Sequence, residues 1–247
     1  MKADMTTNNI SGNVAVVTGA TLGIGRAIAE ALLVEGAEVV ICARRGDEVR
    51  RAVEAMSRFG GLVRGMACDV RKYDQVESLM RFAAEPSGGI DVVVNNAGVG
   101  LFAHISQLTP ADWHEVIDTN LTGVFYCCHA ALPYLRKRGG GHIFNMSSLA
   151  GKEAFEGGSA YNASKFGLNG FSEALMLDLR YENIKVSYVL PGSVYTAFAG
   201  GDTESTPGNW KLAPGDVAQV VVDILQQEQR SLTSRVELRP LKPPRKT

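Results

Sequence analysis

Tyr161 and Lys165 are the residues of this sequence whose types and spacing best suit acid-base chemistry. A tyrosine phenol has a pKa of about 10, and lowering it by about 3 units takes about 4 kcal/mol of extra stabilisation of the phenolate. A nearby cation supplies such stabilisation. On a helix, Lys165 lies about 40° around the axis from Tyr161, on the same side. The spacing predicts an activated phenol, although exposed helical tyrosine-lysine pairs share it.

Glycines at positions 19, 23 and 25 stand between a predicted strand and a predicted helix. Residues 14–17 are consecutively apolar, and residues 24–35 have apolar side chains on one face of a helix. Glycines in this context let the backbone approach a pyrophosphate at the positive end of the helix. The segment predicts a dinucleotide site, with an ordinary turn as the alternative. Because no Gly-Lys-Ser/Thr follows, it is not a P-loop.

The elements that must position these residues alternate between strands and helices. Runs of consecutive apolar residues indicate strands that are buried on both faces. The predicted strands are 14–17, 39–43, 62–68, 92–95, 142–146, 186–190 and 236–239. The alternation predicts an α/β fold of the Rossmann type: a doubly wound, mainly parallel, seven-stranded sheet with helices on both faces. Ligands of such sheets bind at the carboxyl ends of the strands.

A long helix is predicted after Thr109, which suits the N-cap position. Pro110 suits the first helical position, and Asp112 completes a capping box. The pattern continues over residues 111–136, where Pro133 could introduce a kink. A further helix is predicted over 216–227.

Composition limits the possible classes of function. The chain has 247 residues and a formal net charge of -1, which gives no basic surface for nucleic acid or an anionic membrane. Residues 1–10 lack the apolar core of a signal peptide, and no apolar run approaches the ~20 residues of a membrane span. We therefore expect a cytoplasmic protein that binds a small molecule. One domain is expected over 1–247, with loose termini at 1–11 and 240–247.

The cysteines and histidines give no metal-binding pattern. The four cysteines lack C-x-x-C spacing, so we expect buried, reduced thiols. The four histidines are scattered along the chain, and no metal site is expected.

A series of motifs resembles the single-domain branch of the short-chain dehydrogenase/reductase family over about residues 12–240. Its strength lies in the order of the motifs and in the thirteen residues that separate Ser148 from Tyr161. The motifs are Gly-x-x-x-Gly-x-Gly at 19–25, Cys68-Asp69-Val70, Asn95-Asn96-Ala97-Gly98, Asn120, Ser148, Tyr161-x-x-x-Lys165 and Pro191-Gly192.

The resemblance implies an NADP(H)-dependent oxidoreductase that moves hydride between nicotinamide and a carbonyl or alcohol. Tyr161 would be the general acid and base, and Ser148 would hydrogen-bond the substrate oxygen. The family spacing selects Ser148 over the adjacent Ser147. Lys165 would hold the nicotinamide ribose and, with the oxidised nicotinamide, favour the phenolate. Asn120 would stabilise a water that links Lys165 to solvent, or it is a capping or helix-bending asparagine.

Cofactor contacts are implied in the loops that follow the strands. Asp69 and Val70 would contact the adenine, and Val194 and Thr196 belong to a loop that clasps the carboxamide. The full set is Gly19, Thr21, Leu22, Gly23, Ile24, Arg44, Arg45, Asp69, Val70, Asn96, Ala97, Gly98, Tyr161, Lys165, Pro191, Gly192, Val194 and Thr196.

The end of the second predicted strand favours NADP(H) over NAD(H). An NAD-specific site places a carboxylate at this point, where the chain has Ala43. The guanidinium of Arg44 can meet a 2′-phosphate with charge-assisted hydrogen bonds, and Arg45 is a second candidate. Leu22 departs from the basic residue that many NADP-preferring relatives carry, so the preference is expected to be moderate. Both arginines also suit the solvated start of a helix.

Substrate and assembly are less fully specified. Aromatic residues of segments 99–104, 149–158 and 195–212 predict an apolar pocket for a ketone, aldehyde or acyl-thioester chain, or simply pack in loops. They are Phe102, Phe155, Tyr195, Phe198 and Trp210. Segment 197–214 is expected to be a lid. The family pairs helices that correspond to 111–136 and 161–182, which implies a homodimer or homotetramer with Phe125, Phe171 and Leu175 at the interface.

Several readings stay open at this level. The pattern is similar both to 3-oxoacyl-thioester reductases and to carbonyl reductases. A catalytically inactive dinucleotide sensor is an alternative, although the chain keeps the tyrosine and the lysine. An epimerase or dehydratase relative is another, opposed by the short stretch of about fifty residues after Pro191.

Overall fold

The computed structural model describes residues 9–201 and 210–244. Its strands form one seven-stranded sheet in the order β3-β2-β1-β4-β5-β6-β7, and every neighbouring pair is parallel. The strands are β1 Val14–Thr18, β2 Glu38–Ala43, β3 Val63–Ala67, β4 Val92–Asn95, β5 Gly141–Met146, β6 Ile184–Pro191 and β7 Arg235–Leu238. The predicted Rossmann-type sheet is confirmed.

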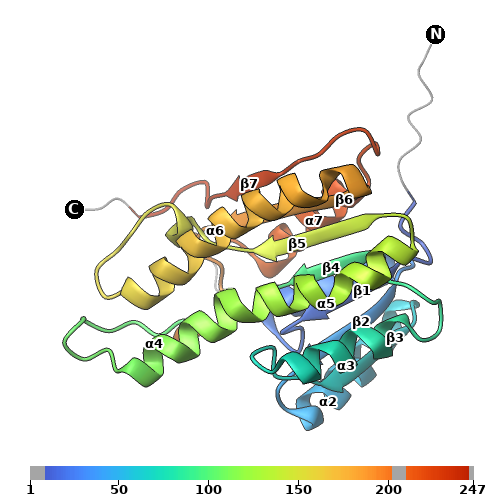
Figure 1. Cartoon of the computed structure of the whole chain (residues 1–247). Coiled ribbons are helices and arrows are strands. Elements are labelled where there is room, and N and C mark those ends of the chain that lie inside the picture. The colour runs from blue at the N-terminus through green and yellow to red at the C-terminus, as the bar shows by residue number, and fades with distance from the viewer. Residues whose placement is uncertain (1–8, 202–209, 245–247) are drawn as a thin grey trace.

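Helices cover both faces of this sheet. One core contains α1 Gly23–Val34, α2 Gly46–Met56 and α7 Pro214–Leu225. The other contains α3 Tyr73–Ala84, α5 Gly123–Lys137 and α6 Ser159–Leu179, which Figure 1 shows on the near face. Within β1, Ala15 and Val17 face the first core while Val14 and Val16 face the second. The expected burial on both faces is confirmed for the inner strands, whereas the edge strands β3 and β7 contain no buried residue.

The helix predicted over 111–136 is interrupted. It consists of α4 Pro110–Ile117, a π-helical turn over Asp118–Thr122, and α5. The predicted capping box is confirmed, since Asp112 N donates to Thr109 Oγ1 at 3.1 Å and Thr109 N donates to Asp112 Oδ2 at 3.2 Å. Figure 1 shows α4 and α5 as one long rod in which Pro133 lies inside α5. In a π-helical turn the hydrogen bonds join residues five apart, where an α-helix joins residues four apart. The spacing of apolar residues in the sequence does not reveal this change.

The sheet order reverses between β1 and β4, where loops leave neighbouring strands in opposite directions. This is the position at which open α/β sheets bind ligands. Gly19 follows β1 with φ of 63°, and a Cβ there would lie 2.8 Å from the Cα of Ala97 in the loop after β4. Only glycine allows these two loops to approach so closely.

Some expectations concern the ends of the chain and the lid. Ile10 is 3% exposed and joins the first core, so the expectation of a loose segment is wrong at this residue. Residues 241–244 are exposed. Residues 1–8 and 245–247 of the termini and 202–209 of the predicted lid lie outside the described residues.

None of the helices in residues 9–201 and 210–244 is long and apolar enough to cross a membrane.

Candidate active site

A cavity of about 730 Å³ opens where the loops leave the carboxyl ends of the strands. Every residue that the sequence assigns to cofactor contact lines this cavity, and so does Ser148. Asn120 is not among the described lining residues and is fully buried. The strand topology thus brings residues from six separate loops to one site.

The start of α1 forms a cradle for an anion. Leu22 is the N-cap and makes no side-chain cap hydrogen bond, which leaves the first backbone N–H groups of the helix for a ligand. Gly23 has φ of 61°, and a Cβ on Gly25 would collide with the side-chain amide of Asn96. These residues fit the pyrophosphate of a dinucleotide, because the glycines carry no Cβ that would keep a ligand away from the backbone N–H groups at the start of α1.

Thr18 joins the loops after β1 and β4. Its Oγ1 accepts hydrogen bonds from the backbone nitrogens of Asn96 and Ala97, each at 3.0 Å. In return, Asn96 Nδ2 donates to the carbonyl oxygens of Thr18 and Gly19, each at 3.0 Å. Sequence reasoning missed Thr18, whose only signal is a buried hydroxyl at the end of an apolar strand.

Ser148, and not Ser147, meets the phenol of Tyr161. Ser148 is the second residue after β5 and lies close enough to Tyr161 to lower the pKa of its phenol, while its Oγ accepts from Ala150 N at 3.1 Å. The hydroxyl of Ser147 instead donates to Asn169 Oδ1 on α6 at 2.5 Å. The two adjacent serines therefore have different partners, and only Ser148 is placed beside the acid-base pair.

The environment of Tyr161 differs from the sequence expectation. The residue is 8% exposed, and burial raises the pKa of its phenol, with partial compensation by the Ser148 hydrogen bond. We had expected the cation of Lys165 to lower this pKa. Desolvation opposes the charged phenolate more strongly here. At neutral pH the phenol therefore holds its proton.

Lys165 is itself buried, at 5% exposure. Its Nζ donates to the carbonyl oxygen of Met146, the last residue of β5, at 2.8 Å and lies 5.8 Å from the centroid of the Tyr161 ring. Burial lowers the pKa of Lys165 to about 8. The carbonyl of Met146 is a further site group that no sequence motif reveals, since any residue supplies it.

Asn120 links the loop after β4 to α6 from within the π-helical turn. Its Oδ1 accepts from Val99 N at 2.8 Å, and its Nδ2 donates to Val99 O at 2.9 Å and to Ser164 Oγ at 3.1 Å. Ser164 Oγ in turn donates to the carbonyl oxygen of Tyr161 at 2.7 Å. The π turn thus aims the Asn120 side chain at the segment that carries Tyr161.

Charged residues gather where β2 and β3 end. Arg44 Nη1 lies 3.1 Å from Glu115 Oε1 of α4, and Arg71 is paired both with Glu115 and with Asp69, the latter at 2.6 Å. The guanidinium of Arg71, followed by Arg44, holds the pKa of Asp69 below its usual range against the effect of burial. Arg45 pairs with Glu48 at the start of α2. Arg71 and Glu115 were missed from the sequence.

Aromatic rings surround Tyr161 at the other end of the cavity. The Phe102 ring lies 5.5 Å from the Tyr161 ring, edge to face, and 5.4 Å from the Phe155 ring. The Phe198 ring lies 5.8 Å from that of Tyr161. Of these three phenylalanines, Phe198 is among the described residues that line the cavity, whereas Phe102 and Phe155 are not.

Tyr195 and Trp210 are likewise not among the described residues that line the cavity, and no ring contact with Tyr161 is described for either. In the backbone of this region, Tyr195 N donates to Leu212 O at 3.0 Å beside the bridge between Val194 and Leu212. This isolated bridge holds the backbone of Val194 and Tyr195 beside that of Leu212.

The four cysteines, Cys42, Cys68, Cys127 and Cys128, are buried and free, as the sequence predicts.

Comparison with known proteins assigns the family. Residues 13–206 match the family model described as short chain dehydrogenase. An uncharacterized oxidoreductase of Staphylococcus aureus is 32% identical over 94% of this chain and 99% of its own length. A metagenomic short-chain oxidoreductase in complex with NADP has a TM-score of 0.83 and 36% identity, over 96% of this chain and 100% of the other.

An alcohol dehydrogenase from the archaeon Thermococcus sibiricus, complexed with 5-hydroxy-NADP, has a TM-score of 0.88 and 28% identity, over 96% of this chain and 100% of the other. The relative and the two solved structures extend the similarity beyond the residues of the family model, to 94–96% of the chain. The chain therefore belongs to the short-chain dehydrogenase family of oxidoreductases.

Proposed function

We propose that this protein is an NADP(H)-dependent oxidoreductase acting on a carbonyl or alcohol substrate, with Tyr161 as general acid and base. The observation that carries the proposal is that Ser148, Tyr161 and Lys165 line one cavity, with the phenol of Tyr161 buried and Lys165 Nζ 5.8 Å from the centroid of its ring. The same cavity holds the glycine cradle of α1 at its other end. This retained acid-base group favours an enzyme over an inactive sensor.

Each side chain has a distinct part in reduction. The phenol of Tyr161 donates its proton to the substrate oxygen, for which its raised pKa keeps it protonated at neutral pH. Ser148 donates a hydrogen bond to the same oxygen and stabilises its developing charge. The ammonium of Lys165 stabilises the phenolate that remains. In oxidation, the phenolate takes the proton back.

Bound nicotinamide supplies or accepts the hydride. Glycines of the α1 cradle would hold the pyrophosphate, Asp69 and Val70 the adenine, and Lys165 the nicotinamide ribose. Arg44 would bind the 2′-phosphate. The metagenomic relative and the archaeal alcohol dehydrogenase, solved with NADP and 5-hydroxy-NADP, support this cofactor. Asn120 would hold a water near Lys165. Its side chain also forms hydrogen bonds with Val99 and Ser164.

The substrate is proposed to be an uncharged carbonyl compound with an apolar ring or chain. Phe102, Phe155 and Phe198 are between 39% and 49% exposed although they surround Tyr161, so they offer apolar surface to a ligand. An apolar pocket around a few polar groups is the usual form of a small-molecule site.

Assembly as a homodimer or homotetramer is also proposed. Phe125 on α5 is 45% exposed and lies 6.3 Å, ring to ring, from Phe171 on α6. Phe171 is part-buried, so Phe125 supplies most of the exposed aromatic surface that a second copy would cover.

The cofactor assignment is tested by the substitution Arg44→Ala. Loss of one charged hydrogen-bonding group is expected to cost about 1.5–3 kcal/mol of binding free energy for NADPH. The KM for NADPH should therefore rise by about 10- to 150-fold, while the KM for NADH changes little. Substrate class is tested by NADPH consumption with ketones, quinones, 3-oxoacyl thioesters, sugars and steroids. Equal use of NADH and NADPH by the wild-type protein, or equal weakening of both by Arg44→Ala, contradicts the assignment.

A further inference from the structure

Four charged side chains from three parts of the chain meet beside the proposed adenosine end of the cavity. Arg44 follows β2, Asp69 and Arg71 follow β3, and Glu115 lies on α4. Arg44 Nη1 is 3.1 Å from Glu115 Oε1, and Arg71 pairs with the other oxygen, Glu115 Oε2. The carboxylate of Glu115 therefore bridges two guanidinium groups.

The formal charges of this cluster cancel. The carboxylate of Asp69 accepts hydrogen bonds from Nε of Arg71 at 2.9 Å and from Nη2 of Arg71 at 2.6 Å. Glu115 forms an ion pair with Arg44. The side chain of Arg44 is 58% exposed and lines the cavity. The basic residue proposed to recognise a 2′-phosphate is thus neutralised in advance by a carboxylate of the same protein.

Arg45 does not relieve this balance, because it pairs with Glu48, and both of these residues line the cavity. At the glycine loop, the position before Gly23 holds the neutral Leu22. Recognition of a 2′-phosphate at this edge would depend chiefly on Arg44, which forms an ion pair with Glu115.

We propose that Glu115 sets the cofactor preference of this protein, by competing with the 2′-phosphate of NADP(H) for the guanidinium of Arg44. This inference rests on the proposed function of Arg44. A phosphate that carries nearly two negative charges and a carboxylate repel each other across one cation. NAD(H) has a neutral 2′-hydroxyl at this position, so Glu115 hinders only the phosphorylated cofactor. Its carboxylate keeps the preference for NADP(H) moderate.

The substitution Glu115→Gln tests this inference because it removes the charge and preserves the shape. Exposed ion pairs are weak, so we expect the Kd of NADP⁺ to fall by about 3- to 10-fold at low salt, and that of NAD⁺ to change by less than about 2-fold. The gain should shrink in about 0.5 M NaCl, which screens exposed charges. Glu115→Ala should also lower the Kd of NADP⁺ and leave that of NAD⁺ nearly unchanged. Either variant can therefore serve if the other folds poorly.

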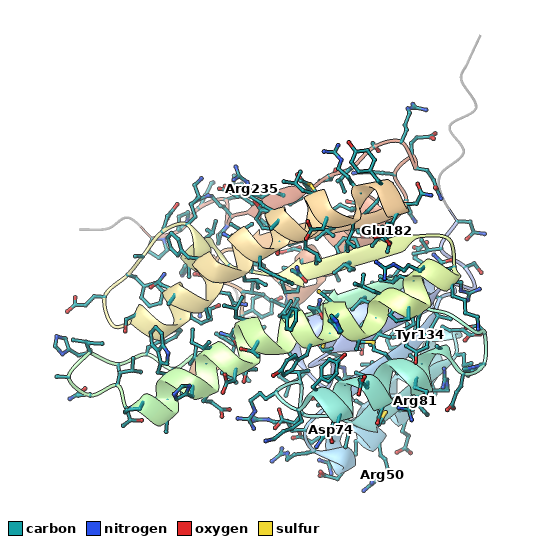
Figure 2. All side chains as sticks on the ribbon, viewed as in Figure 1. Arg50, Asp74, Arg81, Tyr134, Glu182 and Arg235 are labelled. Atoms are coloured by element: carbon teal, nitrogen blue, oxygen red, sulfur yellow. The ribbon has the colours of Figure 1, made fainter. Side chains whose placement is uncertain are left out.

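A matched control is Glu182→Gln. Glu182 also pairs with an arginine, Arg136, at 2.6 Å, and Figure 2 shows it at the end of α6 opposite to the loops of the cavity. This variant should leave both dissociation constants unchanged. Isothermal titration calorimetry with NADP⁺ and NAD⁺ measures binding directly, without turnover.

A double-mutant cycle locates the effect. If Glu115 acts through Arg44, Glu115→Gln should give little gain in an Arg44→Ala background. A full gain in that background, an equal change for both cofactors, or weaker NADP⁺ binding by Glu115→Gln would overturn the inference. If Arg44→Ala alone leaves NADP⁺ binding unchanged, the proposed function of Arg44 fails instead, whatever Glu115→Gln does.

Discussion

Lys165 Nζ lies 5.8 Å from the centroid of the Tyr161 ring, yet its hydrogen bond goes to the carbonyl oxygen of Met146 at 2.8 Å. The lysine is thus fixed to the end of β5, one helical turn from the tyrosine on α6. From this position its charge acts on the phenol through space, in a buried environment where electrostatic interactions are stronger than in water. The charge state of Lys165 therefore matters for the proposed chemistry.

Cofactor capture should depend on pH through Lys165. Burial lowers the pKa of this lysine to about 8. Below that pH the ammonium is present to bind the nicotinamide ribose and stabilise the phenolate, and above it the charge is lost. We expect kcat/KM for NADPH, which reports groups of the free enzyme, to fall as pH rises through about 8. A profile that stays flat to about pH 10 would contradict this.

The two adjacent serines should respond differently to alanine. Ser148→Ala removes the group that faces the substrate oxygen and should lower kcat by about 10²–10³-fold. Ser147→Ala removes the bond to Asn169 and should cost about 1 kcal/mol of unfolding free energy, with kcat nearly unchanged. Steady-state kinetics and thermal unfolding of both variants check this. Similar losses of kcat in the two variants would rule out the distinct role of Ser148.

Phe102 should contribute to the recognition of apolar substrates. Its ring contacts those of Tyr161 and Phe155 while remaining 49% exposed. Phe102→Ala should raise KM for aromatic ketones by about 5- to 150-fold, from the loss of about 1–3 kcal/mol of apolar contact. A small aliphatic ketone serves as the internal control, since it reaches less of the ring. If both substrates lose equally, the ring supports the fold of the site instead.

Assembly can be tested at Phe125. The wild-type protein should show the mass of a dimer or tetramer by light scattering at micromolar concentration. Phe125→Glu places a charge on the exposed face of α5 and should reduce that mass toward the monomer, because an unpaired charge is costly in an apolar interface. A wild-type protein that is monomeric under these conditions would refute the proposed assembly.

The parts of the structure that follow from local pattern were predictable. The strands could be placed because consecutive apolar residues mark strands buried on both faces, and Thr109 marks the start of α4 by its capping box. Family spacing distinguished Ser148 from Ser147, which local chemistry could not do. The π-helical turn over Asp118–Thr122 was missed because one inserted residue leaves the apolar pattern helical.

Long-range contacts were not predictable in the same way. The pair between Arg44 and Glu115 joins residues 71 positions apart, and nothing near either residue indicates the other. The direction of the pKa shift of Tyr161 was wrong because the sequence shows the neighbouring cation but not the burial that opposes it. Both depend on packing between distant segments.

The substitution Tyr161→Phe tests the central claim most directly, because it removes only the phenolic hydroxyl that carries the transferable proton and keeps the ring. Carbonyl reduction at saturating NADPH and the Kd of NADPH should be measured on the same preparation. We predict that kcat falls by about 10²–10⁴-fold or more while the Kd of NADPH stays within about 2-fold of the wild-type value. A Tyr161→Phe variant that reduces substrate at close to the wild-type rate would contradict the account.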